Sequence, residues 1–333
     1  MKKLSKVFAM LLTVAMLFAL AGCGSKPAPE AKPTDAPKAT EAAKKKLKVG
    51  FSQMENNGPW RIAETNSIKD EAKKRGIDLV YTDAQSQTAK QVSDVEDMIA
   101  QKVDYILLAP REFEGLAPAL QSAKKAKIPV ILIDRAAAGK AGEDYVTLIA
   151  SDFILEGQKA GEWLAKQTNG KANIVELTGT TGSSVAKDRQ DGFMKAIKAF
   201  PDMKVIASQD GDFARANGQK VMENIIQAKG KDITAVYAHN DEMAIGAIQA
   251  IKAAGKVPGK DITILSIDGE KDGLKAIIAG EMGATVECNP RFGPSAFDVV
   301  EKLVKGEKVP DKIVNPDQFF DKSNAAQNVD AAY

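Results

Sequence analysis

The sequence predicts an α/β fold built from two doubly wound parallel-sheet lobes. Short, continuously apolar runs recur after residue 46, and amphipathic segments separate them. Runs of this kind are typical of strands that are buried on both faces, as in a parallel sheet. The ten runs occupy residues 47–51, 78–82, 104–109, 128–133, 145–150, 172–177, 203–208, 234–238, 261–267 and 283–287. Because ten strands suit two sheets better than one, we expect two lobes.

The segments between the runs have the pattern of surface helices. One apolar stripe is formed by Val92, Val95, Met98 and Ile99, at the spacing of one helix face. Glycine is favoured just past a helix end, and it follows several of these segments. These glycines are Gly76, Gly230, Gly255 and Gly280.

The first 46 residues indicate export. Lys2, Lys3 and Lys6 precede an apolar run at residues 7–21, which predicts a signal peptide over residues 1–22. That run is shorter than the roughly 20 residues that span a bilayer, so a retained membrane helix is the weaker interpretation. The tetrapeptide LAGC, ending at Cys23, resembles the site at which bacterial lipoproteins are lipidated. Residues 23–46 are rich in Pro, Ala and Lys, and predict a disordered tether behind a lipidated Cys23.

Cysteine count and charge exclude several classes of protein. Cys288 is the only other cysteine, so a lipidated Cys23 leaves no disulfide within the chain. Nine of the 46 basic residues and three of the 44 acidic ones precede residue 47, so the remainder has a net charge of −4. Such a mildly acidic domain gives no indication of nucleic-acid binding.

Polar side chains follow several of the predicted strands. In open α/β sheets the carboxyl ends of the strands border the crevice in which ligands bind. The alternative is that these residues only cap the helices that follow. Arg135, Arg189 and Glu287 are not capping residues and favour a ligand site. The residues directly behind strands are Ser52, Asp134, Arg135, His239, Asn240, Asp268 and Glu287.

The stretch VYAHNDEM, residues 236–243, holds the only histidine of the chain. We expect Asn240 to face the crevice and His239 to point the opposite way. Asp241 and Glu242 would lie at the start of a helix over residues 244–253, where carboxylates favour the backbone dipole. With Cys288 as the only other soft ligand, a zinc site is nearly excluded, and we expect no metal and no cofactor.

The motifs resemble the periplasmic sugar-binding proteins of ABC transporters, of the ribose- and galactose-binding type. The similarity extends over nearly all of residues 47–333, and the galactofuranose-binding members are the most similar. The matching motifs are VGFSQ…PWR, IPVILIDR, IASD, VELTGTTGSSVAKDRQDGF, SQDGDFARANG, VYAHNDEMAIGAIQAI and SIDG.

The resemblance implies a set of ligand contacts. By position they fall on Ser52, Trp60, Arg61, Asp134, Arg135, Arg189, Phe213, Asn240, Asp268 and Glu287. The chemistry suits a sugar, because aromatic planes cover its C–H face and carboxylates with guanidinium groups match its hydroxyls. Core aromatic residues, or a surface ion pair between Asp134 and Arg135, are the alternatives for individual positions. Arg111 also borders the crevice, but we assign it no role.

Arg61 departs from the ribose-binding pattern, in which a second aromatic residue follows the first. Glu64 lies three residues further on the same helix face, and it can orient the Arg61 guanidinium or contact the ligand. Arg61 in place of an aromatic residue removes one stacking surface and adds a hydrogen-bond donor. This change favours a sugar ring that carries an additional hydroxylated arm. We therefore expect a hexose in furanose form, with galactofuranose as the first candidate.

The resemblance also implies the architecture of a type I periplasmic binding protein, a two-lobed clamp with a three-strand hinge. The N-terminal lobe would comprise residues 47–151 plus 288–316, and the C-terminal lobe 152–287 plus 317–333. A monosaccharide would bind between the lobes, and a membrane permease would accept it from the closed form. We expect a monomer held outside the cytoplasm by its lipid, with no enzymatic activity.

Three other classes remain open at this point. A secreted glycosidase would also carry paired carboxylates, but neighbouring arginines should keep these ionised and poor as general acids. A sugar-responsive repressor would need helices that read DNA, whereas the segment before residue 47 is predicted to be a signal peptide and a linker. A binding protein that presents sugar to a chemoreceptor or sensor kinase fits the sequence as well as a transport protein does.

Overall fold

The computed structural model describes residues 46–333, which belong to one compact unit. The predicted signal peptide, the lipidation site Cys23 and the linker up to residue 45 lie outside the described residues. No helix within residues 46–333 is long and apolar enough to cross a membrane.

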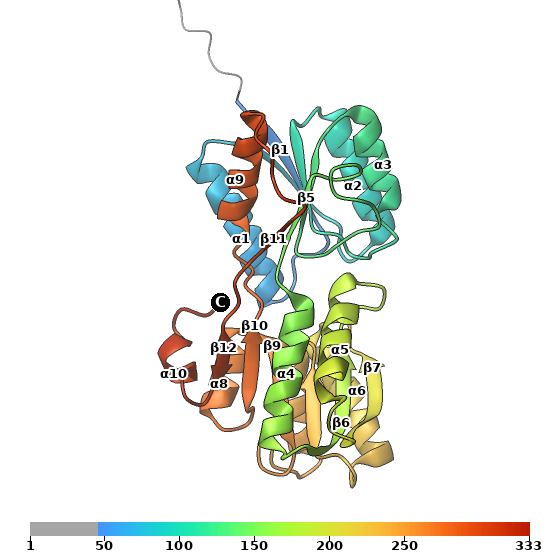
Figure 1. Cartoon of the computed structure of the whole chain (residues 1–333), viewed down its shortest axis with the longest axis vertical. Helices are drawn as coiled ribbons and strands as arrows, with labels where there is room; N and C mark the ends of the chain where they lie inside the picture. The colour runs from blue at the N-terminus through green and yellow to red at the C-terminus, as the bar shows by residue number, and fades with distance from the viewer. Residues whose placement is uncertain (1–45) are drawn as a thin grey trace, which may run out of the picture. The chain divides into compact units, whose positions relative to one another are not determined.

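The first of two sheets has six parallel strands in the order β11-β5-β4-β3-β1-β2 (Figure 1). Its strands are β1 (Lys48–Gln53), β2 (Asp78–Asp83), β3 (Tyr105–Leu108), β4 (Val130–Ile133), β5 (Thr147–Ala150) and β11 (Lys312–Val314). Every residue of β4 is buried, as the unbroken apolar sequence of that strand predicts.

The second sheet has the order β12-β10-β9-β8-β6-β7 and is parallel except for the edge strand β12, which is antiparallel to β10. Its strands are β6 (Lys171–Thr178), β7 (Asp202–Asp210), β8 (Ala235–Ala238), β9 (Thr263–Asp268), β10 (Ala284–Glu287) and β12 (Phe319–Asp321). The two sheets confirm the predicted doubly wound architecture.

Helices cover both faces of each sheet. Around the first sheet, α1 packs against α9 and α2 against α3, and Figure 1 shows the two pairs on opposite sides of the strands. The helices are α1 (Pro59–Lys74), α2 (Thr88–Ala100), α3 (Ala117–Ala126), α4 (Phe153–Gln167), α5 (Ser184–Ile197), α6 (Arg215–Lys229), α7 (Asp241–Ala253), α8 (Lys271–Ile278), α9 (Gly293–Val304) and α10 (Ala325–Asn328).

Two glycines let α4 and α5 approach closely. A Cβ atom at Gly157 would lie 2.1 Å from the carbonyl oxygen of Arg189, and one at Gly192 would lie 2.1 Å from that of Ile154. Because no side chain separates the two backbones, Arg189 on α5 lies next to Glu156 on α4. This packing fixes one of the arginines of the site described below.

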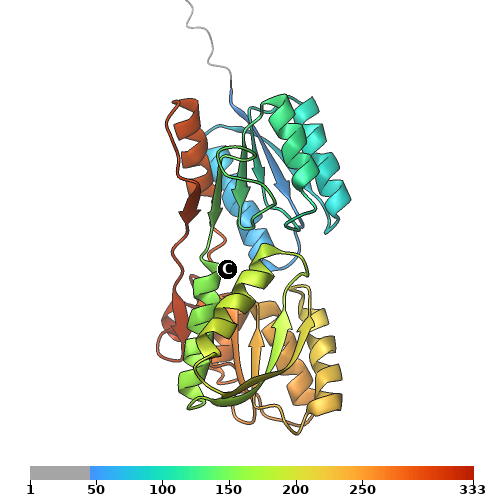
Figure 2. The ribbon, with the colours of Figure 1, turned by 45° about the vertical axis from the view of Figure 1, so that its right-hand side comes forward.

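The chain passes between the two sheets three times, after β5, after β10 and after β11 (Figures 1 and 2). Asp317 in the third passage joins all three. Its Oδ1 atom accepts hydrogen bonds from the Ser151 hydroxyl in the first passage and from the Asn289 backbone N–H in the second, both at 3.0 Å. The three segments are therefore tied to one another at the hinge.

The structure adds two strands to the ten that the sequence predicts. All ten apolar runs form strands, whereas β11 and β12 are only three residues long, too short to give a clear periodic pattern. The helix predicted over residues 244–253 begins three residues earlier. Asn240 caps it by accepting a hydrogen bond from the Met243 N–H at 3.0 Å, which makes Asp241 the first helical residue.

The carboxyl group of Asp317 at the hinge should make the free energy of unfolding depend on pH. Burial raises the pKa of Asp317 from 3.8 to about 6. The folded state then holds a proton that the unfolded chain has released, so stability falls as pH rises from about 4 to about 6. Asp317→Asn keeps the Oδ1 acceptor and removes the titration. We expect it to remove about 3 kcal/mol of this decline in the free energy of unfolding, as measured by urea unfolding. Identical pH profiles of the two proteins would contradict this role of Asp317.

Candidate functional site

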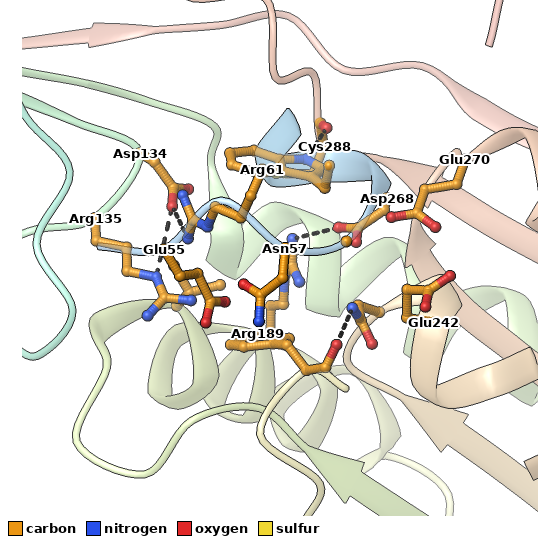
Figure 3. Close-up of a pocket in the computed structure, with 15 residues that line it drawn as sticks. Glu55, Asn57, Arg61, Asp134, Arg135, Arg189, Glu242, Asp268, Glu270 and Cys288 are labelled. Carbon is orange, nitrogen blue, oxygen red and sulfur yellow. Dashed lines mark hydrogen bonds and ion pairs between the residues drawn. The ribbon is translucent and has the colours of Figure 1, made fainter. Parts of the chain in front are cut away.

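A cavity lies between the two sheets, at the ends of strands from both. It contains about 470 Å³ of space free of protein atoms, part of which is open to solvent. Its walls hold side chains that point inward from both halves of the fold (Figure 3). The lining residues are Glu55, Asn57, Gly58, Trp60, Arg61, Asp134, Arg135, Val185, Arg189, Phe213, Asn240, Glu242, Asp268, Glu270 and Cys288.

Arg61 is held by two carboxylates on the side of the first sheet. Its Nη1 atom lies 2.7 Å from Oε2 of Glu64, and its Nη2 atom lies 2.7 Å from Oδ2 of Asp134. Burial disfavours the charged guanidinium, but the attraction of Asp134 and Glu64 outweighs it and raises the pKa of Arg61 above its usual value. Arg61 is therefore a fixed cation with further N–H groups available to a ligand.

Arg135 donates fewer hydrogen bonds within the protein than Arg61 does. Its Nη1 donates to the Arg111 carbonyl at 2.9 Å, and its Nε lies 3.5 Å from Oδ2 of Asp134. Burial and the charge of Arg61 lower the pKa of Arg135 to about 10, so it stays protonated at neutral pH. Both Asp134 and Arg135 are buried, which rules out the alternative of a surface ion pair.

Arg189 is held from three directions on the side of the second sheet. Its Nε lies 2.7 Å from Oε2 of Glu156, its Nη2 lies 3.3 Å from Oδ1 of Asp268, and its Nη1 donates to the His239 carbonyl. Burial opposes the charge, but Glu156 and Asp268 raise the pKa of Arg189 well above its usual value. Each half of the fold thus presents a guanidinium group anchored by carboxyl groups.

Two aromatic rings also line the cavity. The Trp60 indole N–H donates to the Cys288 carbonyl at 2.7 Å, and this bond fixes the plane of the ring. Phe213 lies over Gly179, where a Cβ atom would come within 1.8 Å of the ring. The Asn240 amide holds the same residue by donating to the Phe213 carbonyl at 3.0 Å. The rings belong to different halves of the fold and provide apolar surfaces for a ligand.

Three lining residues have backbone angles that are rare for side-chain-bearing residues. The φ angles are 63° at Asp134, 55° at Phe213 and 130° at Asp268. Each such residue costs about 1–3 kcal/mol unless its surroundings compensate, and such strain gathers at functional sites. The backbone therefore points these three side chains into the cavity at a cost in stability.

Three residues of the predicted contact set do not line the cavity. Ser52 is buried within β1, and Glu64 lies behind Arg61. Glu287 accepts a hydrogen bond from the Gln318 N–H at 2.9 Å and helps to fix the third passage between the sheets. Direct ligand contact by Ser52 and Glu287 stays a prediction, and the position of Glu64 agrees with the alternative that it orients the Arg61 guanidinium. The other eight all line the cavity, namely Trp60, Arg61, Asp134, Arg135, Arg189, Phe213, Asn240 and Asp268.

Several lining residues are not predicted as ligand contacts from the sequence. Glu55 and Asn57 lie in the loop between two matching motifs, and Glu242 is expected only as a residue of the helix start. Glu270 directly follows the SIDG motif, and this position is the one sequence feature that could have indicated a place at the cavity. Their place at the cavity depends on how loops and helix starts are arranged in three dimensions, which local patterns do not encode.

His239 is a core residue. It is fully buried, and its Nε2 lies 3.2 Å from Oε1 of Glu176. Burial lowers the pKa of His239, so it is neutral at pH 7. Within residues 46–333 no group of three or more His, Cys, Asp and Glu side chains is arranged to hold a metal ion.

Comparison with known proteins identifies the family. A model described as "Periplasmic binding protein domain" matches residues 49–308. This chain belongs to the periplasmic binding protein family. The galactofuranose-binding protein YtfQ of Escherichia coli (strain K12) is 50% identical over 270 residues, covering 80% of this chain and 85% of that protein.

Solved structures agree with this assignment. This periplasmic binding protein superimposes on the crystal structure of a galactofuranose binding protein with a TM-score of 0.83 and 47% identity, covering 85% of this chain and 97% of the other. It also resembles the fructose binding periplasmic domain of a hybrid two component system, with a TM-score of 0.79 and 30% identity over 86% and 94% of the two chains. The relatives are sugar-binding proteins that act outside the cytoplasm.

Arg189 should be required for stability as well as for the site. Arg189→Met would leave Glu156 and Asp268 buried without their cation, which typically costs about 3–5 kcal/mol. Urea unfolding measures this loss. Lys252→Met removes an exposed cation that is paired with Glu281, and it should cost less than about 1 kcal/mol. A loss at Arg189 no greater than at Lys252 would contradict the structural importance of the cluster.

Proposed function

We propose that this protein is the lipid-anchored substrate-binding protein of a sugar ABC transporter. It binds a monosaccharide between two lobes and delivers it to a membrane permease. The N-terminal lobe comprises residues 47–151 plus 288–316 and the C-terminal lobe 152–287 plus 317–333. Cys23 carries the lipid that holds the protein outside the cytoplasm, and the protein acts as a monomer.

One observation carries the proposal: the cavity combines two aromatic rings with anchored guanidinium and carboxyl groups from both halves of the fold. A sugar has an apolar C–H face and hydroxyls that both donate and accept, so it matches both kinds of surface. A ligand that contacts both lobes binds the closed state more tightly than the open state. It stabilises the closed state by this difference in binding free energy.

Contacts between the lobes support a closed arrangement in this structure. The Phe113 N–H donates to the Gly182 carbonyl, and the Ala136 N–H donates to the Ser184 hydroxyl, each at 3.0 Å. These bonds join loops of the first sheet to the start of α5. They lie outside the cavity lining and leave the inner polar groups for a ligand.

The preferred ligand is a hexose in furanose form, with galactofuranose first. The position of Arg61 between Glu64 and Asp134 supports a role as a donor to an additional hydroxyl. Two relatives that are named as galactofuranose-binding proteins support this preference.

A sensing role is the second candidate. The fructose binding domain of a hybrid two component system has the same fold and supports this alternative. An enzyme is less well supported, although the expectation that arginines keep every carboxyl ionised does not hold. Burial and the neighbouring carboxylates raise the pKa of Asp268 despite its contact with Arg189. The sugar-binding relatives, rather than the ionisation of the carboxyls, favour a binding protein.

Isothermal titration with galactose, fructose and ribose tests the ligand. We expect galactose, through its furanose form, to bind more tightly than ribose. At 100 times its dissociation constant it should stabilise the fold by about 2.7 kcal/mol. Tight ribose binding without a galactose response would contradict the proposal, and so would release of free sugar from a galactofuranoside.

A further inference from the structure

Glu270 is a buried carboxyl group without a partner at the wall of the cavity. Its exposed fraction is 1%, and neither carboxyl oxygen has a hydrogen-bond partner among the described residues. It lines the cavity on the same side as Asp268 and Glu242 (Figure 3). Since a buried polar group without a partner is costly, its position requires an explanation.

The backbone of Glu270 is fixed although its side chain is not bound. Its N–H donates to Oδ2 of Asp241 at 2.7 Å, and its carbonyl accepts from the Leu274 N–H at 2.9 Å. Glu270 is the N-cap residue of α8, yet its side chain makes no capping bond. The carboxyl therefore lies in the cavity wall instead of serving the helix, as capping side chains commonly do.

The groups around Glu270 oppose a negative charge. Burial raises its pKa well above the usual value, and Asp268, Asp241 and Glu242 raise it further, whereas Arg215 lowers it. Arg215 is already bound to Glu242 and Asp272. Tyr333, whose hydroxyl donates to the Asp268 carbonyl at 2.7 Å, adds no positive charge. A neutral carboxyl both donates and accepts a hydrogen bond.

We propose that Glu270 is a specificity-determining residue that binds the sugar through a neutral carboxyl, donating one hydrogen bond to a ligand oxygen and accepting another from a ligand hydroxyl. The ligand class is then an uncharged polyhydroxylated monosaccharide. This inference rests on the proposed function. It assigns to Glu270 a contact in addition to those made by the arginines and Asp268.

The competing chemistry is an ammonium group on the ligand. An amino sugar would pair with an ionised Glu270 and would gain from Asp268 and Glu242 nearby. In the sugar-free protein four other buried acidic side chains already accompany three arginines around the cavity, so an ionised Glu270 would have no counter-charge there. This favours a neutral Glu270 and with it an uncharged ligand. The four are Glu64, Asp134, Glu156 and Asp268.

The experiment measures galactose and galactosamine affinity by isothermal titration for wild type, Glu270→Gln and Glu270→Leu. Gln keeps a neutral donor and acceptor, so galactose affinity should stay within about 3-fold of wild type. Leu removes both hydrogen bonds, and affinity should fall by at least about 10-fold. Glu281→Gln, which removes a half-buried carboxylate outside the cavity lining in the same half of the fold, should leave affinity unchanged.

Two further readouts separate ligand contact from a structural role. Without sugar, both Glu270 variants should unfold at a urea concentration equal to or above that of wild type, because the removed carboxyl has no partner. The galactose affinity of wild type should fall as the pH is raised. The fall should be smaller in Glu270→Gln, because glutamine at position 270 cannot ionise. Asp241, Asp268, Glu242 and Tyr333 remain in both proteins, so the difference belongs to Glu270.

Three results would overturn this inference: unchanged galactose affinity in Glu270→Leu, tighter binding of galactosamine than galactose by wild type, or strong destabilisation of the sugar-free Glu270→Leu protein. They leave the proposed function intact as long as wild type binds galactose. Failure of wild type to bind any monosaccharide would overturn both proposals together.

Discussion

The balance of buried charge around the cavity is the constraint on which this structure depends. Arg61, Arg135 and Arg189 are almost fully removed from water, and burial of a cation is tolerated only with a partner at close range. Carboxyl groups from α1, α4 and the ends of β4 and β9 supply these partners. The acidic groups outnumber the arginines, and burial raises the pKa of Glu156, Asp268 and Glu270 above the usual values.

The fold supplies the geometry that this balance needs. Parallel strands bring Asp134, Asn240 and Asp268 to strand ends that face one another between the two sheets, and Gly157 and Gly192 let α4 and α5 close around the pair of Glu156 and Arg189. Positive φ angles at the cavity wall are further costs that tight packing must offset. A core rich in Leu, Ile, Val and Ala supports a strained, polar centre that would be unstable alone.

Much of this could be predicted from the sequence, because burial on both faces leaves a continuous apolar signature in strands such as β4. The eight residues common to the prediction and the cavity either follow such strands or belong to family motifs. Pattern reasoning does not reveal that Glu287, the last residue of β10, accepts a hydrogen bond from the Gln318 N–H beside the hinge. It also fails at Glu270, which has the sequence position of an ordinary helix cap but lines the cavity. The directions of these two side chains depend on backbone angles and on contacts far along the chain.

A crystal structure of the protein with bound galactose tests the central claim most directly. The account predicts a sugar ring between Trp60 and Phe213, with hydroxyl groups within hydrogen-bond distance of Arg61, Arg189 and Asp268. It would be contradicted by a sugar bound elsewhere on the surface, or by a ring inside the cavity that leaves the guanidinium groups without ligand contact.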